Sequence, residues 1–529
     1  MTLLYPPQLT EARLETLVTE INDFQLTHGS LAKLTHVGQG HTVLAQPVGV
    51  SCFPTVWPRL CYVQAVKLQQ AFNRLYASIA EDPAWLQALL TDLIDSDSFI
   101  QRLWRIHEHV EQEGYAQRLS LGIFRSDYML NKRRPSGQIQ DAELKQVDFN
   151  TVSVTGGTQG NIVAAMHEHM QLIGAYGFDK AQTLRWMDSV PPCDTVNSVL
   201  SGLTQAHLSY GPITCKAAAS LAILMIVQPG SVNICDEKPI EYGLWDHNPP
   251  IPTFRLEFGG SVLAQTSLAS NRALLYQPPN QPNKLYEISV VYLRAGFEAE
   301  EYDEIGTSAR LELERSRAIK CPSVLTHLAT LRRVQQALAT PGALTRFLSP
   351  EDAACITETL VPMYPMDKSR RGMKARSLAT NPVTAVDYVV KSSVQGGGRN
   401  IYRGDIPAFV RTIPKNKSKE YTLMKMIEAP EVHGTLTSPQ GFYKGPVISE
   451  LGIFGICLWR KKQGGHGAYI VTNKNAGWSF KTKSTEVDDM SIAKGYSFFD
   501  TPYLLDEEDD RYEDSGNGVS CSSSEGDFF

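Results

Sequence analysis

The sequence predicts a mixed α/β fold built from several structural units. At 529 residues the chain is several times the length of a typical domain. Hydrophobic residues make up 42% and charged residues 20%, which is ordinary globular composition. The hydrophobic pattern changes along the chain, from helical spacing in the first 200 residues to short apolar runs after about residue 217.

Helical patterns dominate the N-terminal part. Apolar residues between Leu14 and Ile21 recur on one helix face, and they follow Thr10, a residue type that commonly caps helices. A second apolar stripe of helical period runs from Trp85 to Ile94. We expect both stripes to face the core.

A β-α-β pattern follows the helices. Residues 221–227 and 288–293 are short apolar runs, separated by a helix-like segment and by a loop over 276–284 that is rich in Pro, Asn and Gln. Further strands are expected in a third region, where polar Lys- and Gly-rich breaks indicate hairpins of a mostly antiparallel layer. These strands are 386–391, 421–427 and 448–460, with breaks at 414–419 and 461–467.

The net charge of −6 is unevenly distributed. Residues 506–529 hold nine carboxylates against one arginine, so the rest of the chain carries about +2. We expect this Ser- and Gly-rich segment to be a disordered, solubilising tail, with a docking motif as the alternative. No stripe of Lys and Arg interleaved with aromatic residues is visible, so a nucleic-acid partner is not expected.

Cysteine usage and hydropathy bear on location. The nine cysteines contain no CxxC pair and indicate neither a disulfide framework nor a zinc site, which is typical of a reducing interior. The longest apolar run, 217–227, is eleven residues and too short to cross a bilayer. We expect a cytoplasmic protein with no membrane partner.

Residues 388–402, YVVKSSVQGGGRNIY, are the most informative segment. A strand that ends at Lys391 and precedes Gly396, Gly397 and Gly398 would let backbone amides and a fixed cation approach a polyphosphate. The string is neither a Walker motif nor a dinucleotide fingerprint, so a flexible turn is the alternative.

Asp148 and Asn150 form a second candidate site. In an extended segment they are two residues apart and point to one face, which suits two oxygen ligands of one Mg²⁺. The alternative is that both side chains cap local backbone groups at a strand end.

The chain resembles the eukaryotic-type glutathione synthetase family in ten ordered strings between about residues 5 and 505. These are FPTVWPRLCYVQA, FNRLYASIAED, LGIFRSDYML, KQVDFNTVS, ARLELERSRAIKCPS, RRVQQAL, QGGGRNIY, ISELGIFG, KTK and FDTPYLL. The resemblance implies a circularly permuted ATP-grasp fold with an inserted Rossmann-like substrate-binding domain, and it implies a homodimer. The implied domains are a helix-rich N-terminal part over 1–216, a substrate domain over 217–325 and an ATP-binding part over 326–505, followed by the tail over 506–529.

The implied reaction begins with ATP-dependent phosphorylation of the γ-glutamylcysteine carboxylate. The amine of glycine then attacks the acyl phosphate. ATP, Mg²⁺ and small-molecule acid and amine substrates are thus implied, and the protein mainly supplies cations and alignment.

The resemblance also assigns nucleotide and metal residues. The nucleotide set is Asp148, Arg332, Lys391, Gly396, Gly397, Gly398, Asn400, Tyr402, Met424, Lys425, Met426, Ile427, Glu450, Lys483 and Asp489. The implied catalytic cations are Arg125, Arg332, Lys391 and Lys483, and the implied metal ligands are Asp148, Asn150 and Gln395. Four positions depart from the family: Arg332 and Met426 stand where lysines are usual, and Asp148 and Gln395 stand where glutamates are usual.

The implied substrate contacts depart most. They are Arg125, Val152, Ser153, Val154, Thr155, Ser231, Asn233, Glu237, Arg294, Phe297, Lys481, Ile492 and Ala493. Arg125, Ser153 and Asn233 match the family, and Arg294 closes a strand where an arginine should bind a substrate carboxylate. A family glutamate is replaced by Ser231, a glutamine by Glu237, a tyrosine by Phe297 and an arginine by Lys481. The closing loop, residues 490–495, reads MSIAKG in place of a string of small residues.

Three functions follow from this pattern. The preferred one is an ATP-grasp amide ligase with an altered acid or amine, such as a specialised enzyme of secondary metabolism. The second is a working glutathione synthetase that tolerates the changes. The third is a nucleotide-binding protein that has lost catalysis.

Overall fold

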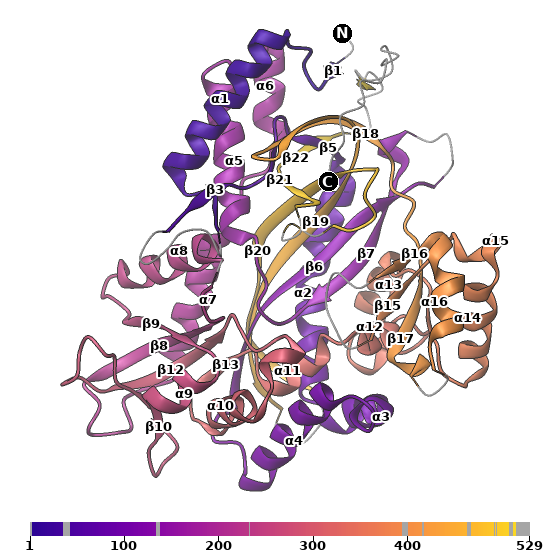
Figure 1. Ribbon diagram of the computed structural model, residues 1–529. Coiled ribbons are helices and arrows are strands. Elements are labelled where there is room, and N and C mark those ends of the chain that lie inside the picture. Colours follow the sequence, from indigo (N-terminus) through magenta and orange to yellow (C-terminus); the bar gives the residue numbers. More distant parts are fainter. Residues whose placement is uncertain are drawn as a thin grey trace.

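A mixed sheet of 13 strands runs through the molecule (Figure 1). The computed structural model describes residues 3–34, 43–133, 138–231, 233–393, 400–414, 417–462, 467–490, 492, 495–506 and 512–514. The strands are Val50–Ser51 (β4), Leu119–Asn131 (β6), Glu143–Asn150 (β7), Ser220–Val227 (β8), Thr253–Glu257 (β9), Thr266–Leu268 (β10), Leu274–Tyr276 (β11), Tyr286–Leu293 (β12), Ile319–Cys321 (β13), Val432–Ser438 (β18), Gly441–Lys461 (β19), Ala468–Ser484 (β20) and Phe498–Asp500 (β21). Their order is β10-β11-β12-β13-β6-β19-β18-β4-β21-β20, with β7 beside β6 and with β8 between β12 and β9. The predicted mixed α/β class is confirmed.

The expected N-terminal helices are present. They are Glu11–His28 (α1), Arg59–Ala80 (α2), Pro83–Ile94 (α3), Ser98–Glu113 (α4), Gly157–Leu172 (α5), Lys180–Ser189 (α6) and Thr195–Ser209 (α7). Helix α3 begins because Asp82 accepts a hydrogen bond from the Trp85 amide and because proline occupies its first turn. Thr10 precedes α1 as expected, although its side chain makes no capping hydrogen bond. Short strands accompany these helices: Leu31–Lys33 (β2) pairs with Ala45–Pro47 (β3), and Thr55–Pro58 (β5) pairs with Pro502–Leu505 (β22).

The β-α-β pattern after residue 217 is confirmed. Strands β9, β8, β12, β13 and β6 are parallel neighbours in that order. Strand β8 is buried along nearly its whole length, as expected of a parallel strand covered on both faces. The helices of this region are Ile234–Trp245 (α8), Gly260–Gln265 (α9), Glu304–Arg315 (α10) and Val324–Ala329 (α11), with a helical turn at Ala299–Glu301 (η2).

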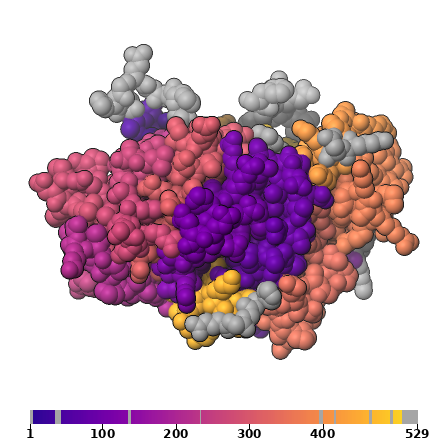
Figure 2. Space-filling view, turned by 90° about the horizontal axis from the view of Figure 1, so that it is seen from below, coloured from indigo at the N-terminus to yellow at the C-terminus, as the bar shows by residue number. Residues whose placement is uncertain are grey.

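A second sheet, of four strands, forms a lobe on the side of the molecule opposite the unit that carries β8 to β12 (Figure 1). Its strands are Met363–Pro365 (β14), Tyr388–Ser392 (β15), Ile401–Tyr402 (β16) and Tyr421–Lys425 (β17), in the antiparallel order β14-β17-β15-β16. The helices are Arg332–Leu338 (α12), Pro350–Thr359 (α13), Arg370–Thr380 (α14), Pro382–Ala385 (α15) and Ile406–Thr412 (α16). Short helical turns complete the list: Ile139–Asp141 (η1), Leu344–Arg346 (η3), Arg403–Asp405 (η4) and Ser418–Glu420 (η5). Seen from below, the N-terminal part lies between this lobe and the unit that carries β8 to β12 (Figure 2).

The expectation of one antiparallel layer after residue 386 is wrong. Strands β15 and β17 belong to the small sheet, whereas β19 belongs to the large sheet and pairs there with β6, β18 and β20. The reason is burial: residues 449–459 of β19 are buried without alternation, so this strand needs the covered interior of the large sheet. The predicted hairpin between residues 460 and 468 is confirmed by the antiparallel pairing of β19 with β20.

The structure describes four residues of the predicted tail, 506 and 512–514, and the rest of it lies outside the described residues, so its disorder stays a prediction. Asp506 forms an ion pair with Arg59, with Nε to Oδ1 at 2.6 Å, and Tyr512–Asp514 (β23) pair in parallel with Leu3–Tyr5 (β1). Within the described ranges, no helix is both long enough and apolar enough to cross a membrane.

His167 of α5 bridges β4 and the residue that follows β21 in the large sheet. Its Nδ1 lies 2.8 Å from the Thr501 hydroxyl and its Nε2 lies 2.9 Å from the Ser51 carbonyl. Burial lowers the pKa of His167 to about 4. As the pH falls from 6.5 to 4, the unfolded chain therefore takes up a proton that the folded protein does not, and stability is lost, by up to about 3 kcal/mol.

We expect His167→Gln to remove part of this acid sensitivity. The measurement is the urea midpoint at pH 7.5 and pH 5.0, with His109→Gln as the control because the His109 side chain is half exposed. An equal loss of stability in wild type and His167→Gln would show that His167 is not the responsible group.

Candidate active site

One face of the small sheet carries apolar and cationic side chains next to each other. Side chains alternate along β15, so Val390 points to the face covered by α14 and α16, whereas Val389 and Lys391 point to the opposite face. Met424 of β17 pairs with Val389 and lies on that same face. Apolar and cationic side chains therefore follow one another along a single strand face.

The apolar part of this face is a small separate cluster. Its buried members are Val361, Met363, Val389 and Met424, and Ala339, Tyr402, Met426 and Ile427 pack against them while remaining partly exposed. The sequence predicted four of these residues, Met424, Met426, Ile427 and Tyr402. It missed the others, of which only Val389 had a signal, namely its alternation with Lys391. Such a partly open apolar surface suits a flat heteroaromatic ring.

Two buried lysines lie beyond the apolar cluster. Lys391 is 7% exposed and Lys483, on β20, is 3% exposed. Burial, followed by the charge of Arg332, lowers the pKa of Lys391 to about 8, and burial lowers the pKa of Lys483 to about 8. Lys483 donates hydrogen bonds to the carbonyls of Ser484 and Val487. Within the described ranges neither lysine forms an ion pair, so both charges are available to an anion.

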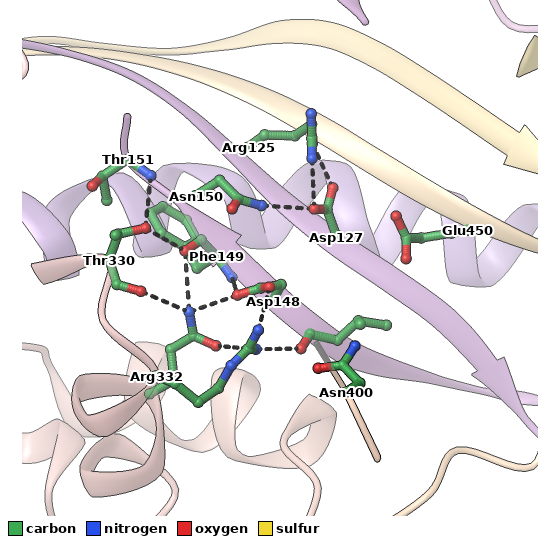
Figure 3. A network of polar contacts seen from close by, with 12 residues as sticks. Arg125, Asp127, Asp148, Phe149, Asn150, Thr151, Thr330, Arg332, Asn400 and Glu450 are labelled. Carbon is green, nitrogen blue, oxygen red and sulfur yellow. Dashed lines mark hydrogen bonds and ion pairs between the residues drawn. The ribbon is translucent and has the colours of Figure 1, made fainter. Parts of the chain in front are cut away.

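Each of the three carboxylates whose charge acts on Lys391 has a cation of its own. Arg125 binds Asp127 through two hydrogen bonds of 2.6 and 2.9 Å (Figure 3). Arg332 lies 2.6 Å from Asp148, and Lys481 lies 2.6 Å from Glu450. Lys391 and Lys483 are thus left without an ion pair in the described part of the site, although the charges of Asp488 and Asp489 also act on Lys483. Two such lysines favour a polyphosphate.

The predicted metal ligands do not fit Mg²⁺ in the described part of the chain. Asp148 accepts hydrogen bonds from Arg332, from Gln335 at 2.7 Å and from the Phe149 amide at 2.9 Å. Burial alone would raise the pKa of Asp148, but Arg332, Lys391 and the hydrogen bond from Gln335 together outweigh burial and hold the pKa below its usual value. Asn150 donates to Asp127 at 2.7 Å. No group of three or more His, Cys, Asp or Glu side chains in the described ranges is arranged to hold a metal ion.

Asp127 and Gln335 are site residues that sequence reasoning missed. Asp127 lies in the FRSDY string two residues after Arg125, and this spacing on one strand face was an available signal. Gln335 had no comparable signal, because it reaches Asp148 from α12 and the two are 187 residues apart in the sequence.

The loop that follows β7 connects Arg125 to a second group of polar residues around Arg294. The Thr155 carbonyl accepts a hydrogen bond from Arg125 at 2.7 Å, and the Val154 carbonyl accepts one from Arg294. Ser153 has a left-handed backbone with φ of 48°, and its hydroxyl donates to the Arg294 carbonyl at 3.0 Å. A non-glycine residue such as Ser153 is held in the left-handed conformation by its surroundings, as is common at binding sites. Val152 is the remaining predicted residue of this loop.

Arg294 itself is occupied by protein groups. Its guanidinium lies 2.7 Å from Asp236, and the two side chains are 2% and 4% exposed. The structure therefore gives Arg294 a buried partner where the resemblance implied a substrate carboxylate. Asp236, the first-turn residue of α8 that makes this ion pair, was missed by the sequence reasoning.

Ser231 and Glu237, two predicted substrate residues that differ from those of the family, contact each other. Glu237 accepts a hydrogen bond from Ser231 at 3.2 Å and forms an ion pair with Arg255 at 2.6 Å. Asn233 precedes α8, and its backbone amide donates a hydrogen bond to the Ser231 hydroxyl at 3.3 Å. The amide of Phe297 donates to Glu301 at 2.9 Å. Ser231 and Glu237 thus form one connected polar unit with Arg255.

The remaining predicted residues are placed as follows. The Asn400 side chain donates a hydrogen bond to the Tyr402 hydroxyl at 3.1 Å. The Lys425 ammonium forms its hydrogen bond with Asp387, at 2.9 Å, rather than lying beside Lys391 and Lys483. The charge of Asp489 acts on Tyr402 and Lys483. The carbonyl of Ile492 accepts a hydrogen bond from Gly495 at 2.9 Å. Outside the described residues lie Gln395, Gly396, Gly397, Gly398 and Ala493.

Comparison with known proteins agrees with this geometry. Residues 11–504 match the family model described as eukaryotic glutathione synthase, ATP binding domain. The chain is 30% identical to the glutathione synthetase large chain of Schizosaccharomyces pombe, over 92% of this chain and 97% of that protein. It is 32% identical to the glutathione synthetase of Bos taurus, over 93% and 97%.

A solved structure shows the same fold. A glutathione synthetase-like effector from Globodera pallida, in its apo form, superposes with a TM-score of 0.71 at 20% identity, covering 96% of this chain and 100% of that one. The predicted family resemblance is confirmed by the family model and by the relatives. The chain belongs to the eukaryotic glutathione synthetase family of ATP-dependent ligases.

Proposed function

We propose that this protein is an ATP-dependent carboxylate-amine ligase whose acid or amine substrate differs from γ-glutamylcysteine or glycine. The nucleotide end keeps a partly open apolar cluster beside Lys391 and Lys483. The observation that carries the altered specificity is the Ser231–Glu237–Arg255 unit, because its new carboxylate already has a cation at 2.6 Å. A ligand group that used these side chains would have to match a different arrangement of charge.

The proposed chemistry needs cations and alignment rather than a protein nucleophile. A carboxylate oxygen of the acid attacks the γ-phosphorus of ATP, the bond to the β-phosphate oxygen breaks, and ADP leaves. The amine then attacks the acyl carbon of the acyl phosphate, inorganic phosphate leaves, and the amine loses a proton. Lys391 and Lys483 would stabilise the charge on the transferring phosphoryl group, and Arg125 would face the acid.

Several finer features stay proposals. The circular permutation, the inserted substrate domain over 217–325 and the other predicted boundaries rest on the resemblance. A homodimer, a cytoplasmic location and a role in secondary metabolism rest on the resemblance and the sequence pattern. A working glutathione synthetase and a catalytically degenerate protein remain the two alternatives.

A substrate panel tests the proposal. Candidate acids, including γ-glutamylcysteine and γ-glutamylalanine, are combined with glycine, β-alanine, serine and small amines, and both ADP release and the product mass are measured. We expect γ-glutamylcysteine with glycine to be a poor pair, since each substrate polar group left unpaired in a rewritten pocket costs about 1 to 3 kcal/mol. The expected product has the mass of acid plus amine minus water.

A matched variant sharpens the panel. Ser231→Glu combined with Glu237→Gln restores the family residues, and we expect it to raise kcat/KM for γ-glutamylcysteine and glycine about tenfold or more. Efficient use of this pair by wild type would favour the working synthetase. Nucleotide binding without turnover on any pair would favour the degenerate protein.

A further inference from the structure

The carboxylate predicted as the first metal ligand is held by protein donors. Oδ2 of Asp148 lies 2.6 Å from a terminal nitrogen of Arg332, and Oδ1 accepts hydrogen bonds from Gln335 and from the Phe149 amide (Figure 3). A carboxylate has about four lone-pair positions, so three of them are used. One of the three donors carries a full positive charge.

Arg332 is fixed in this place from two elements. Its other terminal nitrogen donates to the Val147 carbonyl of β7 at 3.2 Å and to the Gln335 side chain of α12 at 3.1 Å. The Arg332 side chain is only 7% exposed. A guanidinium that is buried and bonded on both sides is part of the site, and its planar fork matches the geometry of a carboxylate.

The local charge also disfavours a second cation. The pair of Asp148 and Arg332 is neutral, and the other two predicted ligands, Asn150 and Gln395, are uncharged amides. Lys391 adds a positive charge that acts on Asp148. A divalent ion beside Asp148 would therefore meet the positive charges of both Arg332 and Lys391.

We propose that the guanidinium of Arg332 takes the place of a divalent cation beside Asp148, so that the site holds only the metal that the nucleotide itself carries. This inference rests on the proposed ATP site. In it Asp148 positions Arg332, and Arg332 supplies at this point the positive charge that a metal ion would otherwise supply.

Electron paramagnetic resonance of Mn²⁺ tests the proposal. Bound Mn²⁺ is counted in the full-length protein saturated with the β,γ-imido analogue of ATP, for wild type, Asp148→Asn and Arg332→Met. We expect Asp148→Asn to bind the same number of Mn²⁺ ions as wild type with affinity unchanged within about twofold. Arg332→Met frees the carboxylate, and we expect one additional ion or an affinity at least tenfold higher.

Two results would overturn the proposal. One is the loss of an ion, or tenfold weaker Mn²⁺ binding, in Asp148→Asn; the other is an unchanged count and affinity in Arg332→Met. Calorimetry with the analogue separates this from the proposed function, because absence of nucleotide binding would contradict the ATP site itself. A titration with Mn²⁺ alone then still decides, since any uptake that depends on Asp148 in wild type contradicts the role of Arg332.

Discussion

Replacing Lys391 by methionine is expected to weaken ATP binding about 10- to 100-fold. Lys391 is buried on the nucleotide face of β15 and has no ion-pair partner within the described ranges. A hydrogen bond to a charged group contributes about 1.5 to 3 kcal/mol, and each 1.4 kcal/mol corresponds to a factor of ten in affinity. Methionine keeps the length and apolar stem of the side chain and removes only the charge.

Isothermal titration calorimetry with ATP measures the effect. Lys368→Met is the matched control, because Lys368 is an exposed lysine of the same lobe, and its affinity for ATP should equal that of wild type. An unchanged ATP affinity in Lys391→Met would place the nucleotide elsewhere on the molecule.

Removing Arg294 is expected to produce the largest loss of stability. Arg294→Met leaves Asp236 as a buried carboxylate without its cation, in a place where the two side chains are 2% and 4% exposed. Breaking a buried ion pair from one side costs about 3 to 5 kcal/mol. We expect a correspondingly lower urea midpoint for the transition that unfolds this region.

A double variant distinguishes the ion pair from simple loss of volume. Arg294→Met combined with Asp236→Asn should recover most of the stability, since no buried charge remains. Arg59→Met, which breaks the exposed ion pair with Asp506, should cost less than about 1 kcal/mol. If Arg294→Met costs no more than Arg59→Met, the Arg294–Asp236 pair does not stabilise this region.

Local patterns predicted most of the fold. The stripe between Trp85 and Ile94 has helical period, and the apolar run that became β8 is short and continuous, so each specifies its element within its own residues. The long strand β19 could not be assigned to its sheet in the same way. Its partners β18 and β20 are its neighbours in the sequence, but β6 comes from the N-terminal part of the chain, and a pattern of side chains does not say that these distant strands will pair.

The sequence predicted which residues belong to the site, but it did not predict which of them pair with one another. The family strings identified Asp148, Arg332 and Glu450 as site residues, yet they assigned Asp148 to a metal and Arg332 to phosphate. The ion pair between these two joins residues 184 positions apart, and it depends on how α12 packs against β7. The same is true of Arg294, whose partner Asp236 is brought to it by α8. Tertiary packing decides which charged residues pair in this way, and the identity of each residue alone does not reveal it.

The most direct test of the ligase follows oxygen from the acid to the phosphate. The best acid of the substrate panel is labelled with ¹⁸O in its carboxylate and incubated with ATP and the amine, and the inorganic phosphate is analysed by mass spectrometry. An acyl phosphate intermediate predicts one ¹⁸O atom in each phosphate released, together with ADP and one amide per ATP. Release of AMP and pyrophosphate, or of phosphate without ¹⁸O, would contradict the account.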